Sequence, residues 1–370
     1  MKKQYAAPIF ILLSLYIGFN GAFLFDYILE MNVYYFWIPF VVFTLSFFLG
    51  RFIDHLAIGR FIKVFGALFL SLFLPFLYVA IPVDLLLISL YSLELLTSHL
   101  INIILIIGLF TFITLLLVMY RNAWSPVVQH HTINSTKGSE ASSFKIAVIT
   151  DIHLGNINGN RRIQQLVKKV NRLEADAIAL VGDVMEDNIE PLKRNKMFDE
   201  LSKLQSKLGT FVVLGNHEFY GQDVDEYVEH MQRANFSLLR DEIINLGDSI
   251  SIIGRKDAED PSDRKLAKHI VNDVSKDRFG IVLDHQPLDL DELSDYDHID
   301  LIFSGHTHRG QVSPLQFVTN KKFPLDYGIK TTKGTSMIVS SGFGTWGPPI
   351  RLGSRSEIRF VDVRFRNATS

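Results

Sequence analysis

Eight side chains of metal-binding type occur in five short motifs in the second half of the sequence. They are Asp151 and His153; Asp183; Asn216 and His217; His285; and His306 and His308. In the first and last motifs the paired residues are two positions apart, and on an extended backbone such residues project to the same side. Each pair can therefore chelate one ion or share a pair of ions. Imidazole suits transition metals and carboxylate suits harder cations, so this set without sulfur indicates Mn, Fe or Zn.

Two cations a few ångströms apart repel each other, and a shared anion such as the carboxylate of Asp183 offsets that repulsion. A structural role competes with this interpretation at each position taken alone. A single histidine after a strand, such as His285, is more often an ordinary hydrogen-bonded residue, and a single Gly-Asp pair is usually a turn. Five motifs that all carry metal-type side chains, each after an apolar run, are hard to reconcile with chance.

The motifs require strands that end where each motif begins. Short apolar runs predict these strands, and three segments between them have helical periodicity. The predicted strands are 145–150, 177–181, 211–214, 249–253, 281–283, 301–303, 337–340 and 358–363, and the predicted helices are 161–173, 197–208 and 223–235. This alternation predicts an α/β domain layered around buried sheets. Because ligands gather at the carboxyl edge of open α/β sheets, five strand ends can deliver their residues to one place.

The five motifs resemble the signature of calcineurin-like metallophosphoesterases over about residues 144–365. The residues that carry the resemblance are Asp151-x-His153, Gly182-Asp183, Gly215-Asn216-His217-Glu218, His285 and Gly305-His306-Thr307-His308. Gly310-Gln311, the segment 347–353 and Glu357 resemble more narrowly the bacterial membrane-associated branch of that family. The resemblance implies an α/β four-layer metallophosphoesterase domain, in which two packed β-sheets are flanked by helices. It does not extend to residues 1–121.

The same resemblance implies a role for each motif residue. The first of two divalent metal ions would be held by Asp151, His153, Asp183 and His308, and the second by Asp183, Asn216, His285 and His306. Mn is favoured over Fe and Zn. His217 would be catalytic, facing the phosphate rather than a metal, with Asp151 as a partner for its imidazole and Glu218 as a structural residue. The guanidinium of Arg309 would reach a phosphate or, as we favour, lie in solvent.

The implied reaction is hydrolysis of a phosphate mono- or diester, including a lipid-linked one, by attack of a metal-bridging hydroxide. A regulatory module that binds metal without turnover is the alternative, and the intact set of eight residues weighs against it. Soluble cyclic nucleotides also fit this chemistry. Apolar residues flank the late motifs and either line an acyl groove or belong to a buried core. They are Leu315, Phe317, Val318, Phe323, Phe343, Trp346 and Ile350.

The first 121 residues have the composition of a membrane anchor. Only six of the 37 Lys and Arg residues and five of the 39 Asp and Glu residues lie there, together with 17 of the 29 Phe. A span needs about 20 mostly apolar residues, and four stretches approach this length: 8–25, 33–50, 64–83 and 100–120. We interpret 85–96, which contains Glu94, as an interfacial helix. The sequence thus predicts an α-helical membrane bundle of about four spans in 1–121, a linker over 122–143 and a catalytic domain over 144–370.

Charge and composition exclude several other classes. The net charge of −2 offers no basic field for coating nucleic acid. The chain has no cysteine, which excludes a disulfide partner and thiolate ligands. Charge-poor spans do not favour a channel or transporter. Because residues 1–121 contain the predicted spans, the expected location is the cell membrane, with a multi-pass anchor.

The basic residues that flank the four predicted spans place the catalytic domain in the cytoplasm. They are Lys2, Lys3, Arg51, Arg60, Lys63 and Arg121, and the two intervening loops have none. Because the chain lacks cysteine, the substitution Ser370→Cys introduces a single reactive thiol. We expect a membrane-impermeant maleimide to label this variant only after lysis. Labelling of intact cells would refute the cytoplasmic placement.

Overall fold

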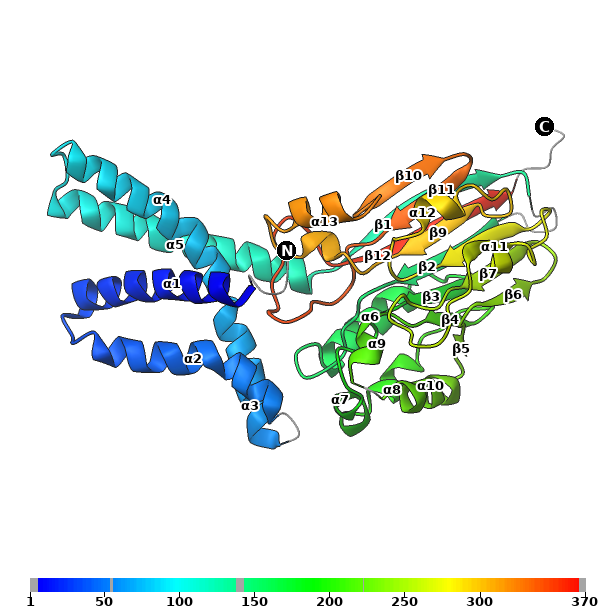
Figure 1. Cartoon of the computed structure of the whole chain (residues 1–370), viewed down its shortest axis with the longest axis horizontal. Coiled ribbons are helices and arrows are strands. Elements are labelled where there is room, and N and C mark those ends of the chain that lie inside the picture. The colour runs from blue at the N-terminus through cyan, green and yellow to red at the C-terminus, as the bar shows by residue number, and fades with distance from the viewer. Residues whose placement is uncertain (1–5, 54–55, 138–142, 222, 366–370) are drawn as a thin grey trace. The chain divides into compact units, whose positions relative to one another are not determined.

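The structure is a computed structural model, and it describes residues 6–53, 56–137, 143–221 and 223–365 (Figure 1). It divides into two compact units. The first contains residues 1–121 with 347–349, and the second contains 122–346 with 350–370. Lys2, Lys3 and Ser370, used in the topology prediction, lie outside the described residues, as does the linker segment 138–142.

The described part of the first unit consists of apolar helices. They are α1 (Ala6–Leu29), α2 (Tyr34–Phe52), α3 (Ala57–Leu70), α4 (Phe73–Ser92) and α5 (Ser98–Trp124). Three segments of the described chain are long and apolar enough to cross a membrane, namely Ala7–Leu29, Ala57–Ser92 and Ser98–Trp124, and Tyr34–Gly50 is a shorter apolar helix. The predicted N-terminal set of apolar helices is confirmed. The predicted number of about four spans agrees approximately with these three long segments and one shorter helix.

The third predicted span and the predicted interfacial helix need correction. The chain turns between α3 and α4, where the Ser71 hydroxyl donates to the Leu68 carbonyl at 2.5 Å. The predicted span 64–83 therefore crosses a helix boundary. Residues 85–92 continue α4 instead of forming a helix of their own. Asp84, which lies between the third and fourth predicted spans, is inside α4 and accepts a 2.6 Å hydrogen bond from Tyr16. Apolar composition alone could not locate the break at residues 71–72, because apolar residues continue on both sides of it.

The second unit is built on two sheets, each with six strands among the described residues. The first runs β1 (Val127–Ser135), β12 (Glu357–Phe365), β2 (Ser143–Ile149), β3 (Ala177–Val181), β4 (Thr210–Val213) and β5 (Ser237–Leu238). The second runs β10 (Gly328–Thr332), β11 (Thr335–Val339), β9 (Leu301–Ser304), β8 (Phe279–Leu283), β7 (Ile250–Gly254) and β6 (Glu242–Leu246). Strands β2 to β5 are parallel, and so are β7, β8, β9 and β11. The motif-bearing strands of each sheet therefore end at a common edge.

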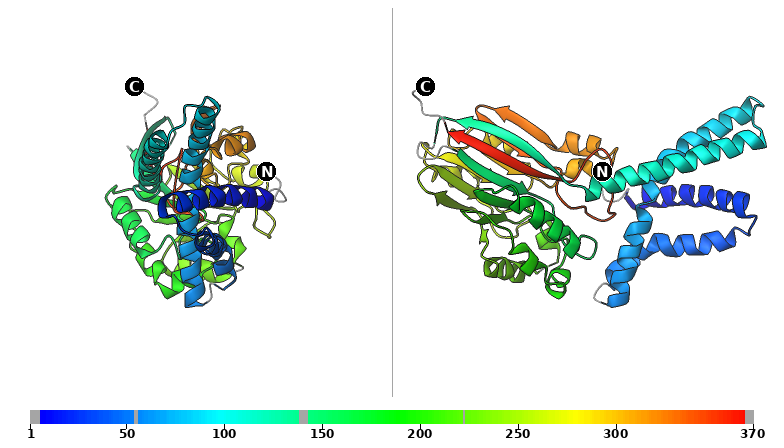
Figure 2. Two further views of the ribbon diagram at one scale, coloured as in Figure 1. Left: turned by 90° about the vertical axis from the view of Figure 1, so that its left-hand side faces the viewer. Right: turned by 180° about the vertical axis from the view of Figure 1, so that it is seen from behind.

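The second unit has two sheets with helices on their outer sides (Figure 2), and the alternation of side chains along each strand divides the core into layers. In β2, Phe144, Ile146 and Val148 pack between the two sheets, whereas Ala147 and Ile149 face the helices on the other side. The helices that pack on the first sheet include α6 (Asn160–Asn171), α7 (Glu190–Arg194), α8 (Met197–Leu201) and α10 (Val224–Arg233). Those that pack on the second are α11 (Ala267–Val271) and α12 (Leu290–Leu293). This is the predicted four-layer arrangement.

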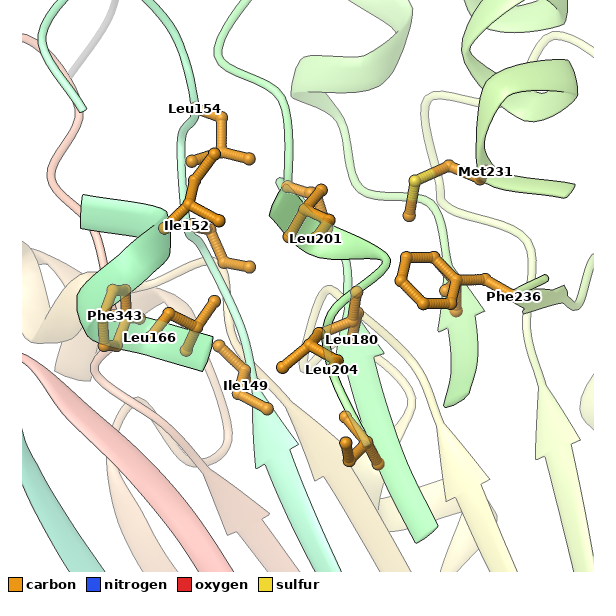
Figure 3. Packing of buried hydrophobic residues seen from close by; sticks show 14 of the residues in the cluster. Ile149, Ile152, Leu154, Leu166, Leu180, Leu201, Leu204, Met231, Phe236 and Phe343 are labelled. Carbon is orange, nitrogen blue, oxygen red and sulfur yellow. The ribbon is translucent and has the colours of Figure 1, made fainter. Parts of the chain in front are cut away.

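Figure 3 shows the cluster that holds the helical layer on the first sheet. Leu166 from α6 and Leu201 from α8 pack over Ile149 and Leu180 at the ends of β2 and β3. Ile152 belongs to the same cluster and lies between Asp151 and His153 in sequence. Packing therefore anchors the chain on both sides of the first motif.

Two predicted segments differ from the structure. Residues 127–135, placed in the linker, form β1 and pair with the full length of β12. This edge strand is only half-buried and polar at several positions, so its composition is that of a linker. The helix predicted over 197–208 ends at Leu201. Three further short helices, α9 (His217–Tyr220), α13 (Gln316–Lys322) and the 3₁₀ turn η2 (His308–Gly310), lie beside the motifs.

We expect the packing between the sheets to dominate the stability of the second unit. Phe211 in β4 is 2% exposed in that layer, and Phe211→Ala should cost about 3–5 kcal/mol because it leaves a cavity. This loss corresponds to a fall of about 10 °C or more in melting temperature. The control Leu208→Ala, at a residue 48% exposed, should change stability by about 0.5 kcal/mol or less. Thermal unfolding of the full chain in micelles measures both, and equal shifts would contradict this layering.

Candidate metal centre

The structure brings all eight predicted residues to one edge of the two sheets. Asp151 and His153 follow β2, Asp183 follows β3, and Asn216 and His217 follow β4 of the first sheet. His285 follows β8, and His306 and His308 follow β9 of the second. Six of the eight side chains are buried, and His217 and His306 are half-buried. Both sheets therefore supply the same group of polar side chains.

The first cluster contains Asp151, His153 and His308, which offer ligand atoms within 4.8 Å of one another. The Nε2 atoms of His153 and His308 face each other at 2.9 Å. His308 Nε2 also lies 3.3 Å from Asp151 Oδ1. Three donors from β2 and β9 thus converge on one point.

The second cluster contains Asp183, His285 and His306, again with ligand atoms within 4.8 Å. His285 Nε2 lies 3.1 Å from Asp183 Oδ2, and the Nδ1 of the same ring donates to the Val181 carbonyl at 2.9 Å. That hydrogen bond keeps a proton on Nδ1, so the lone pair of Nε2 is available to coordinate a metal. Asn216 Oδ1 joins this cluster at 2.7 Å from His306 Nδ1.

The carboxylate of Asp183 links the two clusters through a single oxygen. Its Oδ2 atom lies 3.1 Å from His285 Nε2 and 3.9 Å from His153 Nε2. Its Oδ1 atom instead accepts a 2.9 Å hydrogen bond from the backbone N–H of His217. The geometry favours one shared oxygen, rather than one oxygen for each cluster.

The backbone at this edge is turned sharply. Five of the motif residues have left-handed conformations, with φ between 48° and 68°: Asp151, His153, Asp183, His306 and His308. Aspartate and histidine enter this region more readily than most residues, but each such position still costs about 1 kcal/mol or more. Strain concentrated at five candidate ligands is typical of a functional site.

Glycine is required at two motif positions because a neighbouring carboxylate lies against the backbone there. A Cβ atom at Gly215 would collide with Asp183 Oδ1, and one at Gly305 would collide with Asp151 Oδ2. The glycines that precede Asn216 and His306 therefore allow the two carboxylates to sit against neighbouring strand ends. This steric requirement explains why these two motifs begin with glycine.

His217 lies beside both clusters, and its partner differs from the predicted one. Its Nδ1 atom is 2.5 Å from the Glu186 carbonyl and 3.2 Å from Asp187 Oδ1, so Asp187 rather than Asp151 holds the imidazole. Burial lowers the pKa of His217, but the hydrogen bond to Asp187 and the charge of Asp183 outweigh it and raise the pKa to about 9. The ring is therefore protonated at neutral pH when the two clusters hold no cation.

Glu218 has a structural position, as predicted. Its Oε2 atom accepts from the backbone N–H groups of Asp183 at 3.0 Å and Gly215 at 2.7 Å, and its Oε1 accepts from Met185 at 2.9 Å. Burial and the charge of Asp183 raise the pKa of Glu218 to about 7. The side chain ties the ends of β3 and β4 together.

Known proteins share these features. Residues 144–310 match the family model described as calcineurin-like phosphoesterase. An uncharacterized metallophosphoesterase of Aquifex aeolicus is 30% identical over 246 residues, 64% of this chain and 91% of that protein. The chain belongs to the metallophosphoesterase family.

Two further relatives each match about 60% of this chain. An uncharacterized metallophosphoesterase of Helicobacter pylori is 33% identical over 232 residues, 60% of each chain. A transmembrane protein with metallophosphoesterase domain from Bos taurus is 34% identical over 234 residues, 59% of this chain and 52% of that protein. The chain spans about 60% of the length of the first curated relatives that it matches.

Divalent metals, which this metallophosphoesterase family binds, fit the residues present. Burial and the charge of His285 lower the pKa of His306 to about 3, and burial and the charge of His153 lower the pKa of His308 well below its usual value. These imidazoles are neutral at pH 7, the state that coordinates metals. Burial opposes protonation of His285, but the charge of Asp183 raises its pKa well above its usual value. A bound cation would take the place of that proton.

Sequence reasoning assigned no role to two residues that support the metallophosphoesterase site. Glu186 Oε2 lies 2.9 Å from His153 Nδ1, and its position three residues after Asp183 is the signal that could have found it. Arg351 is fully buried and lies 3.2 Å from His308 Nδ1. It also donates to the Gly344 carbonyl at 2.6 Å, and the Gly344 N–H donates to the Asp151 carbonyl at 2.7 Å. The resemblance of the segment 347–353 to the family branch is the signal that could have found Arg351.

A cavity of about 390 Å³ opens beside the clusters and is lined by Asp183, Asn216, His217, His306 and His308, among others. Of the apolar residues that flank the late motifs, Leu315, Val318, Phe323 and Trp346 line this cavity, and Phe317, Phe343 and Ile350 do not. Phe323, Phe343 and Ile350 are buried, whereas Leu315, Phe317, Val318 and Trp346 are exposed. Arg309 is half-buried with its guanidinium 4.6 Å from the Tyr327 ring centre, so the favoured placement in solvent is wrong.

The bridging position of Asp183 predicts the outcome of its replacement. Asp183→Asn removes the shared negative charge, so the protein should lose bound metal and turnover while it keeps its circular dichroism spectrum. The control Asp225→Asn changes an exposed carboxylate on α10 and should bind as much metal as the wild type. Plasma mass spectrometry of desalted protein measures the metal content. Two full equivalents in Asp183→Asn would contradict the bridging assignment.

Proposed function

We propose that this protein is a membrane-anchored phosphoesterase that hydrolyses a phosphate mono- or diester at a dinuclear metal site. The observation that carries the proposal is the pair of ligand clusters that meet at Asp183 Oδ2, beside a cavity that His217 lines. A regulatory module without turnover would not need a protonated imidazole in that cavity. We therefore favour catalysis over the regulatory alternative.

We infer that two divalent cations occupy the clusters. Asp151, His153, Asp183 and His308 would hold one, and Asp183, Asn216, His285 and His306 would hold the other. The nitrogen and oxygen donors suit Mn, Fe or Zn, and we favour Mn. When bound, such a pair supplies a nucleophilic water at neutral pH and offsets charge on the phosphoryl oxygens.

His217 would act on the substrate through the proton that its surroundings keep on the ring. Asp187 orients the imidazole through Nδ1, and Asp183 and Glu186 add negative charge nearby. A protonated imidazole in the cavity can stabilise charge on a phosphoryl oxygen and donate its proton to the leaving oxygen. Acid catalysis of this kind contributes about 10²–10⁴-fold to the rate.

We propose that residues 1–121 are the membrane anchor and that the catalytic domain lies on the cytoplasmic side of the cell membrane. The first strand of that domain, β1, begins three residues after the end of α5. The last residues of α5 are bound into the domain, since Gln165 donates to the Trp124 carbonyl at 3.1 Å and Arg162 donates to the Ala123 carbonyl at 2.8 Å. Such a short tether supports action at the membrane surface.

The role of His217 predicts a leaving-group dependence. His217→Ala should keep both metals and lower turnover of an alkyl phosphate ester by about 100-fold or more, because the general acid is lost. The defect should be smaller for 4-nitrophenyl esters, whose leaving group needs no proton. Steady-state hydrolysis by Mn²⁺-loaded protein measures both rates.

The control for this variant is His269→Ala, which changes an exposed histidine on α11 and should leave both rates unchanged. Loss of metal from His217→Ala would mean that His217 is a ligand. An absence of hydrolysis by the metal-loaded wild type, with 4-nitrophenyl mono- and diesters alike, would overturn the proposed function.

A further inference from the structure

We propose that the substrate carries an apolar group next to its phosphate, and that this group lies along one face of α13 and against Trp346. This inference rests on the proposed function and names the class of ester that the site takes. The class is an amphiphilic phosphate ester, of which a lipid phosphate is one example.

The apolar surface and the candidate metal ligands line the same cavity. Beyond Asp183, His217 and His306, the lining includes Leu315, Val318, Thr319, Lys322, Phe323 and Trp346. The volume of about 390 Å³ lies in the range of small-molecule sites, which are mostly apolar with a few convergent polar groups. A phosphate bound near Asp183 would therefore have its substituent directed along this surface.

The lining residues of α13 lie on one helical face. Leu315, Val318, Thr319 and Lys322 are spaced i, i+3, i+4 and i+7, which places their side chains in one row. Phe323 at the end of the helix is 6% exposed, and its ring meets that of His306 at 5.6 Å. Phe323 thus connects the apolar row directly to the second ligand cluster.

The two apolar residues of the row are exposed to solvent. Leu315 is 42% exposed, Val318 is 50% exposed, and Trp346 across the cavity is 45% exposed. Exposed apolar side chains that face one cavity are typical of a binding site, because burial by a ligand removes them from water. Single exposed residues need no such explanation, but these three line one cavity together with the polar site.

The positive charge of Lys322 matches the anionic head of an amphiphilic ester. Lys322 occupies the last position of the row, with its Nζ 4.8 Å from the Phe323 ring centre, and it lines the cavity near His306. A lysine ammonium at this position would pair with a phosphate oxygen. The row thus runs from an apolar start at Leu315 to a cationic end beside the polar cluster, as an ester with an anionic head and an apolar tail requires.

Insertion of α13 into a lipid surface is the competing explanation for its exposed residues. Phe317 separates the two, because it is 72% exposed but does not line the cavity. Membrane insertion would use Phe317 more than Val318. A substrate in the cavity would use Val318 and leave Phe317 without effect.

The test compares two soluble diesters with the same leaving group, methyl 4-nitrophenyl phosphate and butyl 4-nitrophenyl phosphate. The full chain is reconstituted in nanodiscs and loaded with Mn²⁺, and kcat/KM is measured for both. If only monoesters react, methyl and butyl phosphate replace them, with phosphate release as the readout. We expect the wild type to prefer the butyl ester by about tenfold, since each added methylene is partly buried.

The double variant Leu315→Gln/Val318→Asn should reduce this preference to about twofold or less, and Trp346→Gln should reduce it in part. The control Phe317→Gln should keep the wild-type preference. Metal content and melting temperature of each variant show that the site and the fold are intact. Because the readout is a ratio within one variant, a general loss of activity does not affect it.

The outcomes separate the inference from the proposed function. Hydrolysis without a preference for butyl in the wild type overturns the inference and leaves the proposed function intact. A preference that is lost equally in Phe317→Gln and in the double variant also overturns it, and favours membrane insertion of α13. If no ester of either series is hydrolysed, the proposed function fails and the inference fails with it.

Discussion

The Oδ2 atom of Asp183 is the point on which the rest of the site depends. It lies 3.1 Å from His285, delivered by the second sheet, and 3.9 Å from His153, delivered by the first. Asp183 itself follows β3 of the first sheet, so its distance to His285 depends on how the two sheets pack. The inter-sheet layer of Phe144, Ile281 and their neighbours sets that packing, so the core of the domain fixes the separation of the two ligand clusters.

The position of the Asp183 carboxylate requires a strained backbone and close packing, and hydrogen bonds from neighbouring backbone groups to Glu218 offset these costs. Asp183 adopts φ of 51°, and it approaches Gly215 too closely for any side chain there. Glu218 compensates by accepting hydrogen bonds from the backbone of Asp183 and Gly215, at the expense of its own burial. The buried hydrogen bonds of Glu218 at the ends of β3 and β4 thus rigidify Asp183, as the proposed dinuclear site would require.

Much of this arrangement follows from sequence, because the strands are short apolar runs and the ligands follow their ends. The layered α/β fold and the convergence of the eight residues are predictable in this way, whereas the four-layer arrangement was implied by the family resemblance. The strand β1 was not predictable, because an edge strand such as Val127–Ser135 is half polar and has no apolar run. The contact of Arg351 with His308 and the partnership of Asp187 with His217 depend on loop paths that no local pattern encodes. The helix break at Ser71 was missed for a similar reason, since apolar residues continue on both sides of it.

The central claim, that two ions share Asp183, is tested most directly by the electron paramagnetic resonance spectrum of the Mn²⁺-loaded full chain. Two Mn²⁺ ions bridged by one carboxylate oxygen are magnetically coupled, so the account predicts two equivalents of Mn²⁺ and the broad, temperature-dependent signal of a coupled pair. The six-line signal of isolated Mn²⁺ at full loading would contradict it, because the ions would then be single or too far apart to share Asp183.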